Sequence, residues 1–311
     1  MDKISNDATI NYKLYYIISF ILSNMLNFYA LKIIIVIYIL DRGIIMKGIL
    51  KRILCVSIVA TIGLSIVGCG ETPTMERIEK SGKLVVGTSA DYAPYEYHTM
   101  VDGKDTIIGI DISIVNEIAK DLGVQLEIVD MGFDGLLAAL NSNKVDIVIA
   151  GMNPDEERRK AVDFSKIYYE AKQGVLVRTE DKDKVKTIDD LNGKNVGVQL
   201  GTTQESIAKK QMENAKLVSL GKIPDLVMEL KNEKIDAIVV ELPVANGYIK
   251  NNNDLALSGI TVEEESGGSA IAVKKGNSDL VALIDKSLDR LMEEGAIDKF
   301  VQEANDKNVT K

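Results

Sequence analysis

The polar residues of this chain that could bind a ligand stand just after predicted strands. Arg158, Thr203 and Glu241 each follow a short apolar run of the kind that forms a buried strand. In open α/β sheets, ligands bind beyond the carboxyl ends of the strands, where helix N-termini present free N–H groups. A guanidinium binds a carboxylate through paired hydrogen bonds, a helix start holds an anion, and a carboxylate holds an ammonium. Together these three residues would suit a zwitterion.

A second group of candidates lies in and near the aromatic, proline-containing loop after the first predicted strand. Ser89 and Asp91 belong to this loop, and Glu96 closes it. If Asp91, Glu96 and Asp134 lined the side-chain end of a pocket, they would favour arginine, lysine or histidine, because buried carboxylates need a compensating cation. Ser89 and Gln199 would equally suit glutamine, so that ligand stays open as an alternative.

The composition argues against several other kinds of site. The chain has one His and two Cys, so a zinc site would lack nitrogen and sulfur ligands, and His98 is expected to be a loop residue. The formal net charge is −9, which repels nucleic acid and anionic lipid headgroups. We therefore expect no metal, no other cofactor and no nucleic-acid partner, and no residue receives a catalytic role.

Short apolar runs alternate with helical stripes from Lys83 onward, which is typical of α/β architecture. Strands are expected at 83–87, 125–129, 145–150, 195–198 and 234–240. Helices are expected at 112–122, from near 134, from near 153, after 203, at 281–291, and in a short stretch around 300. Asn153 is expected to cap its helix, because a proline and then an acid follow it at the favoured positions.

The predicted strand at 145–150 is echoed at 234–240, about ninety residues later. A single repeat of this length indicates two similar lobes, since a solenoid needs shorter and more numerous repeats. The expected boundaries are 82–172 and 269–311 for lobe 1, and 173–268 for lobe 2. The chain would then cross between the lobes near 170–174 and again near 266–269.

Cys69 ends a stretch with the pattern of a secretory signal. A basic segment at 46–52 precedes an apolar run at 53–67, which is too short to span a bilayer comfortably. The residues just before Cys69 resemble the lipobox of bacterial lipoproteins, in which the Cys thiol receives a diacylglycerol and becomes the first mature residue. We expect a lipoprotein signal peptide at 46–68, lipidation of Cys69 and a polar tether at 69–82.

Residues 1–45 do not fit this pattern. Their apolar run from Tyr15 to Leu40 is interrupted by polar residues, and either a membrane helix or a start codon assigned too early would explain it. We prefer the second explanation, with Met46 as the initiator. Removal of residues 1–68 takes away more basic than acidic residues, so the mature chain would be more acidic and its membrane attachment would depend on the lipid.

From Lys83 to Ala304 the sequence resembles the family-3 solute-binding proteins of ABC importers for polar amino acids. The segments 87–96, 109–114 and 201–205 carry the resemblance. The family implies a two-lobed, periplasmic-binding-protein-like fold of type II with the ligand cleft between the lobes. It also implies that the lobes close on one amino acid by hinge motion at the two chain crossings.

The resemblance assigns roles to the matching residues around the ligand. Tyr92 and Phe133 would sandwich the ligand side chain, and Gly151 and Asn153 would contact its ammonium or carboxylate. Ala150 stands where the family often has Ser, so a ligand contact there would have to come from the backbone.

The charged groups of the ligand have their own partners by the same resemblance. Arg158 would pair with the α-carboxylate with help from Thr203, and Glu241 would hold the α-ammonium. Glu241 replaces the more usual Asp and has a longer side chain, which would slightly shift the position of the ammonium.

These expectations combine into an extracytoplasmic lipoprotein on the cell membrane that captures a polar amino acid. It would act as a monomer, deliver the ligand to an ABC permease with its ATPase, and perform no covalent chemistry. A prephenate or arogenate dehydratase on the same fold is the alternative, but no His or Lys is evident beside Glu241 or Asp91 to assist a general acid. A receptor sensor domain would require a following membrane helix, whereas this sequence ends in a charged tail.

Overall fold

The structure is a computed structural model, and it describes residues 73–170, 172–262 and 267–307. The expected initiator Met46, the signal peptide at 46–68 and the lipidated Cys69 lie outside the described residues. Within the described part of the chain, no helix combines the length and the apolar character needed to cross a membrane.

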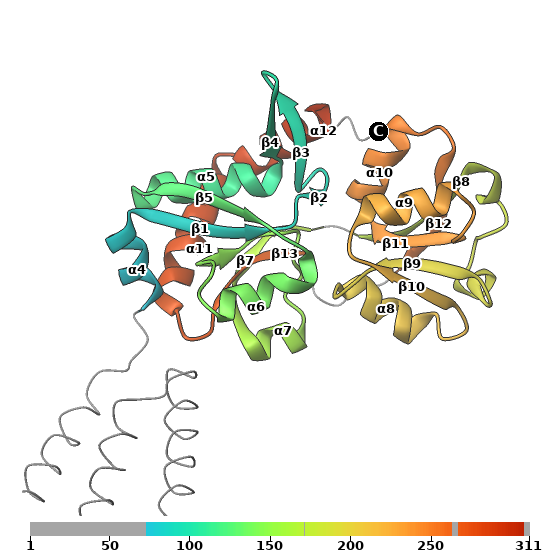
Figure 1. Cartoon of the computed structure of the whole chain (residues 1–311), viewed down its shortest axis with the longest axis horizontal. Helices are drawn as coiled ribbons and strands as arrows, with labels where there is room; N and C mark the ends of the chain where they lie inside the picture. The colour runs from blue at the N-terminus through green and yellow to red at the C-terminus, as the bar shows by residue number, and fades with distance from the viewer. Residues whose placement is uncertain (1–72, 171, 263–266, 308–311) are drawn as a thin grey trace, which may run out of the picture. The chain divides into compact units, whose positions relative to one another are not determined.

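The first sheet has the strand order β5-β1-β6-β13-β7, and β1, β5, β7 and β13 are labelled in Figure 1. Its strands are β1 (Lys83–Thr88), β5 (Gln125–Asp130), β6 (Ile147–Val148), β7 (Val162–Tyr169) and β13 (Ser269–Lys274). Strand β1 pairs in parallel with β5 and β6, whereas β13 is antiparallel to both β6 and β7. A strand from late in the chain thus lies between two earlier strands, and we call this sheet with its helices lobe 1.

The helices of lobe 1 come from both ends of the described chain. They are α4 (Thr74–Ser81), α5 (Ile110–Leu122), α6 (Leu136–Asn141), α7 (Glu156–Ala161), α11 (Ser278–Glu293) and α12 (Ala296–Lys307), with the 3₁₀ turn η1 (Phe133–Gly135) ahead of α6. Along α11, Leu280, Ile284, Leu288 and Leu291 are buried at helical spacing. The amphipathic helix predicted at 281–291 is confirmed, because this apolar face packs on the core.

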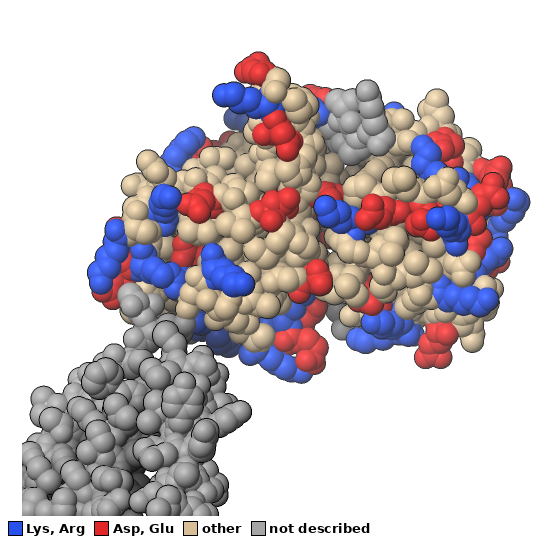
Figure 2. All heavy atoms as spheres, viewed as in Figure 1, with Lys and Arg blue, Asp and Glu red and all other residues tan. Residues whose placement is uncertain are grey.

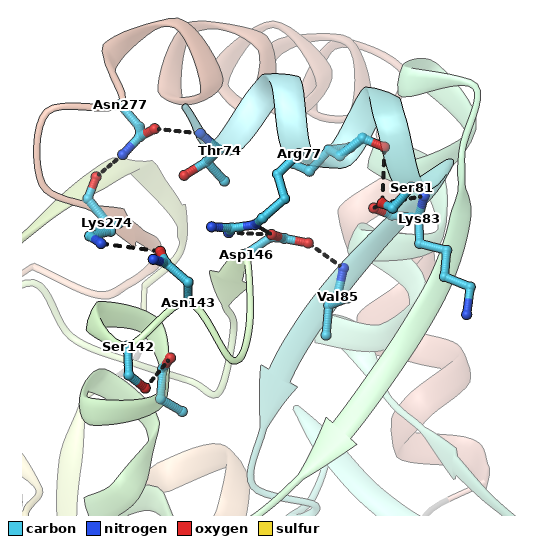
Figure 3. A network of polar contacts seen from close by, with 12 residues as sticks. Thr74, Arg77, Ser81, Lys83, Val85, Ser142, Asn143, Asp146, Lys274 and Asn277 are labelled. Carbon is cyan, nitrogen blue, oxygen red and sulfur yellow. Dashed lines mark hydrogen bonds and ion pairs between the residues drawn. The ribbon is translucent and has the colours of Figure 1, made fainter. Parts of the chain in front are cut away.

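The segment before β1 is a helix and not a free tether. Ile78 of α4 is buried in the main hydrophobic core. Arg77 donates a 2.6 Å hydrogen bond to one oxygen of Asp146, whose other oxygen accepts the N–H of Val85 at 2.9 Å (Figure 3). The expected tether is therefore wrong from Thr74 onward, because an otherwise polar sequence carries one core residue and one anchoring Arg.

A small antiparallel sheet, which the sequence analysis did not predict, extends from lobe 1. It consists of β2 (Asp91–Tyr92), β3 (Glu96–Val101) and β4 (Lys104–Ile108) in that order. The turn between β3 and β4 is Asp102-Gly103, and both residues have positive φ, 51° and 76°. An Asp-Gly pair with positive φ suits a two-residue hairpin. The predicted ligand loop is thus partly a strand pair, with Glu96 as the first residue of β3.

The second sheet has the order β10-β9-β11-β8-β12, and we call it with its helices lobe 2 (Figure 1). Its strands are β8 (Gln173–Arg178), β9 (Asn195–Gln199), β10 (Lys216–Leu220), β11 (Ala237–Glu241) and β12 (Leu255–Val262). Its helices are α8 (Thr203–Gln211), α9 (Ile223–Lys231) and α10 (Leu242–Asn251), with 3₁₀ turns η2 (Thr179–Asp181) and η3 (Ile188–Leu191). Strand β9 is parallel to β10 and β11, as β1 is to β5 and β6.

The chain passes between the two sheets in two places. The first passage lies between Tyr169 at the end of β7 and Gln173 at the start of β8. The second lies between Val262 at the end of β12 and Ser269 at the start of β13. Gln173 pairs with Val262 in the second sheet, and Tyr169 pairs with Ser269 in the first, so the ends of the two passages lie next to each other in both sheets.

The predicted cap at Asn153 is wrong. Helix α7 begins at Glu156 and its N-cap is Asp155, whose carboxylate accepts the backbone N–H of Arg158 at 2.8 Å. An Asp at the N-cap satisfies a free helical N–H in the same way as the predicted Asn would. Asn153 precedes Pro154, which biases its backbone away from helix and leaves its amide side chain available elsewhere.

Candidate ligand-binding site

A pocket opens where the carboxyl ends of β1, β6 and β9 meet. The predicted site residues that line it are Ser89, Asp91, Tyr92, Phe133, Gly151 and Asn153. The pocket has a free volume of about 10 Å³, which is the space of a single water molecule. This space is too small for an amino acid.

Arg158 lies at the border of this pocket and reaches across to lobe 2. Its guanidinium donates to the carbonyl oxygens of Asn153 at 2.7 Å and Gly201 at 3.0 Å. It also lies 5.2 Å from the centroid of the Phe133 ring, in cation–π geometry. The side chain is buried and its Nε lies 3.5 Å from the Asp155 carboxylate, whereas its two terminal nitrogens face backbone oxygens, for which a ligand carboxylate would be a stronger acceptor.

Thr203 and Asn153 connect the two lobes directly. The Thr203 hydroxyl donates to Oδ1 of Asn153 at 2.8 Å, and Nδ2 of Asn153 donates to the Gly268 carbonyl at 3.2 Å. The N-cap of α8 is Thr202, which accepts the N–H of Glu205, so the neighbouring Thr203 is the residue that faces lobe 1. The Asn153 amide thus joins α8 to the second chain passage.

Gly151 is oriented by Asp111, a residue that the sequence analysis quoted only as part of a family motif. The Gly151 N–H donates to Asp111 at 2.8 Å, and the Tyr168 hydroxyl donates to both oxygens of the same carboxylate at 2.9 Å. A Cβ on Gly151 would lie 3.1 Å from the Tyr92 ring, and its φ is +53°. The amide is already bonded to Asp111, so Gly151 offers a ligand its carbonyl oxygen, which suits an ammonium.

The two aromatic residues predicted to sandwich the ligand both line the pocket. Tyr92 is stacked on Tyr95, with ring centroids 5.5 Å apart and an interplanar angle of 20°. Phe133 lies under the Arg158 guanidinium. Each ring therefore has a supporting partner that holds it in place at the pocket wall.

Glu241 is the last residue of β11 and is buried. Its Oε1 accepts a 3.5 Å contact from the amide of Gln173, and Oε1 of Gln173 accepts from the amide of Gln204 at 3.0 Å. Gln204 lines the pocket and also donates to the Tyr92 hydroxyl at 3.3 Å. Glu241 is thus linked to the pocket through two glutamines and does not itself line the small remaining space.

The sequence analysis missed both glutamines as site residues. Gln204 belongs to the quoted segment 201–205, so that motif could have pointed to it. No local signal marks Gln173, the first residue after a chain passage. Asp134, which the sequence analysis offered as a lining residue, is exposed, although its Cα lies 3.3 Å from the position of a Cβ built on Gly201.

The electrostatics of the pocket are dominated by buried acids. Burial raises the pKa of Asp91 to about 6, with Lys222 opposing the shift and Asp130 adding to it. Burial, and then the like charge of Asp111, raises the pKa of Glu96 well above its usual range. Acidic and basic side chains are interspersed over the visible surface in Figure 2. The carboxyls of Asp91 and Glu96 are the acidic groups that line the pocket and could favour a cationic ligand.

Residues 84–305 match the model of the bacterial extracellular solute-binding proteins, family 3. The chain belongs to this family. The arginine-binding extracellular protein ArtP of Bacillus subtilis is 38% identical over 256 residues, covering 81% of this chain and 96% of that protein. A probable histidine-binding protein of Campylobacter jejuni is 34% identical over 260 residues, covering 81% and 98%.

A solved structure extends the comparison of this family 3 solute-binding protein to three dimensions. The amino acid ABC transporter substrate-binding protein AbpA of Streptococcus pneumoniae, bound to L-arginine, has a TM-score of 0.74 at 41% identity. The match covers 76% of this chain and 100% of that one. The predicted family and the predicted two-lobed α/β fold are confirmed by this likeness and by the two five-stranded sheets.

Proposed function

We propose that this protein binds a free basic amino acid, arginine above all, and delivers it to an ABC permease with its ATPase. The observation that carries the proposal is that the buried carboxyl of Glu96 and the half-buried carboxyl of Asp91 line one pocket, and that the Arg158 guanidinium is bonded to the carbonyl of Asn153, another lining residue. The Arg158 guanidinium would bind the α-carboxylate of an amino acid, and the carboxyls of Asp91 and Glu96 would bind a cationic side chain. The relatives named above as arginine-binding and histidine-binding proteins support the same ligand class.

The proposed binding event exchanges contacts between the lobes for contacts with the ligand. The α-carboxylate replaces the Gly201 carbonyl as the acceptor for Arg158 and receives the hydroxyl of Thr203. The α-ammonium is held by Glu241 and by the carbonyl of Gly151. The two chain passages, whose ends lie side by side in both sheets, act as the hinges on which the lobes open and close.

We propose that the protein is attached to the membrane by a lipid on Cys69, after the signal peptide at 46–68 has been removed. Helix α4 begins at Thr74, so only a few residues would separate the lipid from the folded lobe. Labelled palmitate supplied to a bacterial host should be incorporated into the wild-type protein. A Cys69→Ala variant should carry none, while a Cys55→Ala variant should be labelled normally. Equal labelling of the Cys69→Ala variant would refute this anchor.

The proposed ligand is tested by a thermal-shift screen of the full chain in detergent against the twenty common amino acids and ornithine. A ligand at a hundred times its dissociation constant adds about 2.7 kcal/mol to the free energy of unfolding, which gives a clear rise in Tm. Arginine should give the largest shift, and titration calorimetry should then give the affinity. The proposal fails if no amino acid shifts Tm or produces heat.

We further propose that the protein is a monomeric binding protein and not a dehydratase. The relatives compared above carry the names of binding proteins. Incubation with prephenate should yield no phenylpyruvate, and formation of phenylpyruvate at a rate above the uncatalysed reaction would contradict the proposal. Light scattering of the purified protein should give the mass of a single chain.

A further inference from the structure

Two carboxyl groups, those of Glu96 and Asp111, are buried against each other in lobe 1. Glu96 is the first residue of β3 and Asp111 is the second residue of α5, and neither has exposed surface. A hydrogen bond joins the two carboxyls. An ionised carboxylate only accepts hydrogen bonds, and with both groups ionised the oxygens of Glu96 would lack a donor. One of the two carboxyls must therefore carry a proton.

Asp111 is the ionised member of this pair. Its carboxylate accepts the N–H of Gly151 at 2.8 Å, and each of its oxygens accepts the Tyr168 hydroxyl at 2.9 Å. Burial raises the pKa of Asp111 to about 6, and these hydrogen bonds together with the one from Glu96 oppose a larger rise. Burial, and then the negative charge of Asp111, raises the pKa of Glu96 well above its usual range. The proton therefore stays on Glu96 at neutral pH.

The surroundings of the pair favour a single shared proton. The charged groups that act most strongly on Glu96 are all acids, namely Asp111 of α5, Asp91 of β2 and Glu241 of β11. Tyr168 of β7 interacts with both carboxyls, and burial keeps its hydroxyl neutral by raising its pKa. Loss of the proton would place two negative charges in contact at a buried site, where their repulsion is screened least.

We propose that a protonated Glu96 holds the Asp111 carboxylate in place, and that the two carboxyls together position Gly151 for the ligand. This inference rests on the proposed function, in which the Gly151 carbonyl contacts the α-ammonium. Asp111 fixes the Gly151 N–H and so restrains the backbone at this residue. Glu96 donates its O–H to Asp111 and keeps its carbonyl oxygen as an acceptor for the ligand.

Gly151 is packed closely beside the pocket, so a shift of its backbone reaches the ligand. A Cβ at this position would lie 3.1 Å from the ring of Tyr92, which lines the pocket. Tyr168 stands one residue before the end of β7, where the first chain passage begins. The carboxyl pair thus connects a proposed ligand contact to the segment that leads into lobe 2.

The first test is infrared spectroscopy of the ligand-free full chain at pH 7.5, in a detergent without carbonyl groups. At this pH Asp91, with its pKa of about 6, is ionised. The wild-type spectrum minus that of Glu96→Gln should contain the carbonyl stretch of one protonated carboxyl. The matched control is Glu127→Gln, because Glu127 is an exposed acid of the same lobe that pairs with Lys83 at 2.9 Å. The difference spectrum of this control should contain no such band.

The second test is calorimetric titration with arginine at the same pH. Glu96→Ala removes the donor to Asp111 and should weaken binding about 10-fold or more, as expected when a buried polar group is left unmatched. Glu96→Gln offers an amide N–H in place of the O–H and should recover most of this loss. Asp111→Ala leaves the Gly151 N–H without its acceptor and should also weaken binding about 10-fold or more. If Glu96 faced the ligand as an ionised group instead, its Gln and Ala variants would lose equally.

The outcomes separate this inference from the proposed function. Absence of the protonated-carboxyl band from the wild-type protein, or equal losses of arginine affinity in the Gln and Ala variants of Glu96, would overturn the inference alone. If Glu96→Gln does not fold, wild-type protein containing glutamate labelled with carbon-13 in the side-chain carboxyl decides, and a band that the label does not shift overturns the inference. Failure of the wild-type protein to bind any amino acid would refute the proposed function, and the ligand-positioning role with it, whatever the infrared result.

Discussion

The Thr203 hydroxyl donates a 2.8 Å hydrogen bond to Oδ1 of Asn153, and this bond joins helix α8 of lobe 2 to the loop that follows β6 in lobe 1. Both side chains are buried. The Asn153 amide continues the connection to the Gly268 carbonyl at 3.2 Å. Contact between the lobes is therefore anchored at the chain passage as well as at the pocket.

Replacing Thr203 with Val removes the hydroxyl and keeps the shape of the side chain. The ligand-free protein should open more often, and the affinity for the ligand should fall about fivefold, because one net hydrogen bond contributes about 1 kcal/mol. Small-angle X-ray scattering without ligand should show a larger radius of gyration. Thr261→Val, at an exposed position of β12, is the control and should match the wild type. A scattering curve and an affinity that both stay unchanged in Thr203→Val would contradict the role of this bond.

Replacing Arg158 with Ala should lower ligand affinity by about 100-fold or more, because a buried carboxylate would lose its charged partner. Arg158→Lys should recover only part of the affinity, since an ammonium cannot reproduce the forked contacts of a guanidinium. The neighbouring Arg159 is exposed, and Arg159→Ala is the matched control. Calorimetric titration measures all three variants. Near-wild-type affinity of the Arg158→Ala variant would exclude the proposed carboxylate contact.

The ion pair between Arg77 and Asp146 should be important for stability. Asp146 is nearly buried, with its side chain 7% exposed, and it holds both the guanidinium and the Val85 N–H (Figure 3). Asp146→Ala should lower the free energy of unfolding by about 2 kcal/mol, because it leaves two partly buried donors, of Arg77 and Val85, unpaired. The exposed pair Lys83–Glu127 is the comparison, and Lys83→Ala should cost less than about 1 kcal/mol. Urea denaturation measures both, and equal losses would show that burial does not matter here.

Asp91 should reduce stability at neutral pH, and the sign follows from its raised pKa of about 6. In the unfolded chain this carboxyl has its ordinary pKa of 3.8, so between pH 3.8 and about 6 the folded state binds more protons than the unfolded state. The ionised Asp91 therefore lowers the free energy of unfolding more and more as the pH rises through this range, and this loss reaches its full size above about pH 6. Asp91→Asn should raise the free energy of unfolding at pH 7 by about 1–2 kcal/mol, after allowance for solvent screening, and should make no difference below pH 3.8.

Denaturation of the wild-type and Asp91→Asn proteins at pH 7 and at pH 3.5 tests whether the substitution raises the free energy of unfolding only at the higher pH. A variant less stable than the wild type at pH 7, or a gain that is the same at both pH values, would contradict it. The expected gain in stability should come with weaker arginine binding, since functional sites often reduce stability.

Local rules in the sequence predicted those parts of the fold that depend on neighbouring residues. The apolar face of α11 and the parallel strand β9 follow from periodicity over a few residues. The same rules failed where two local solutions compete, as at α7, where Asp155 and not Asn153 caps the helix. They also failed at α4, where one buried Ile78 within a polar segment is too weak a signal to distinguish a docked helix from a tether.

The sequence alone determined the family and the two-lobed α/β plan and pointed to Tyr92 and Phe133, which line the pocket, because motif residues and strand ends are read along the chain. Only the tertiary structure decided that the Asp111 carboxylate accepts the hydrogen bond of the Gly151 N–H. It also decided that Gln173 links Gln204 to Glu241 through hydrogen bonds. It further decided that Glu96 is fully buried beside the carboxyl of Asp111. These relations join residues far apart in the chain, and burial and hydrogen bonding between distant segments leave no mark on the local sequence pattern.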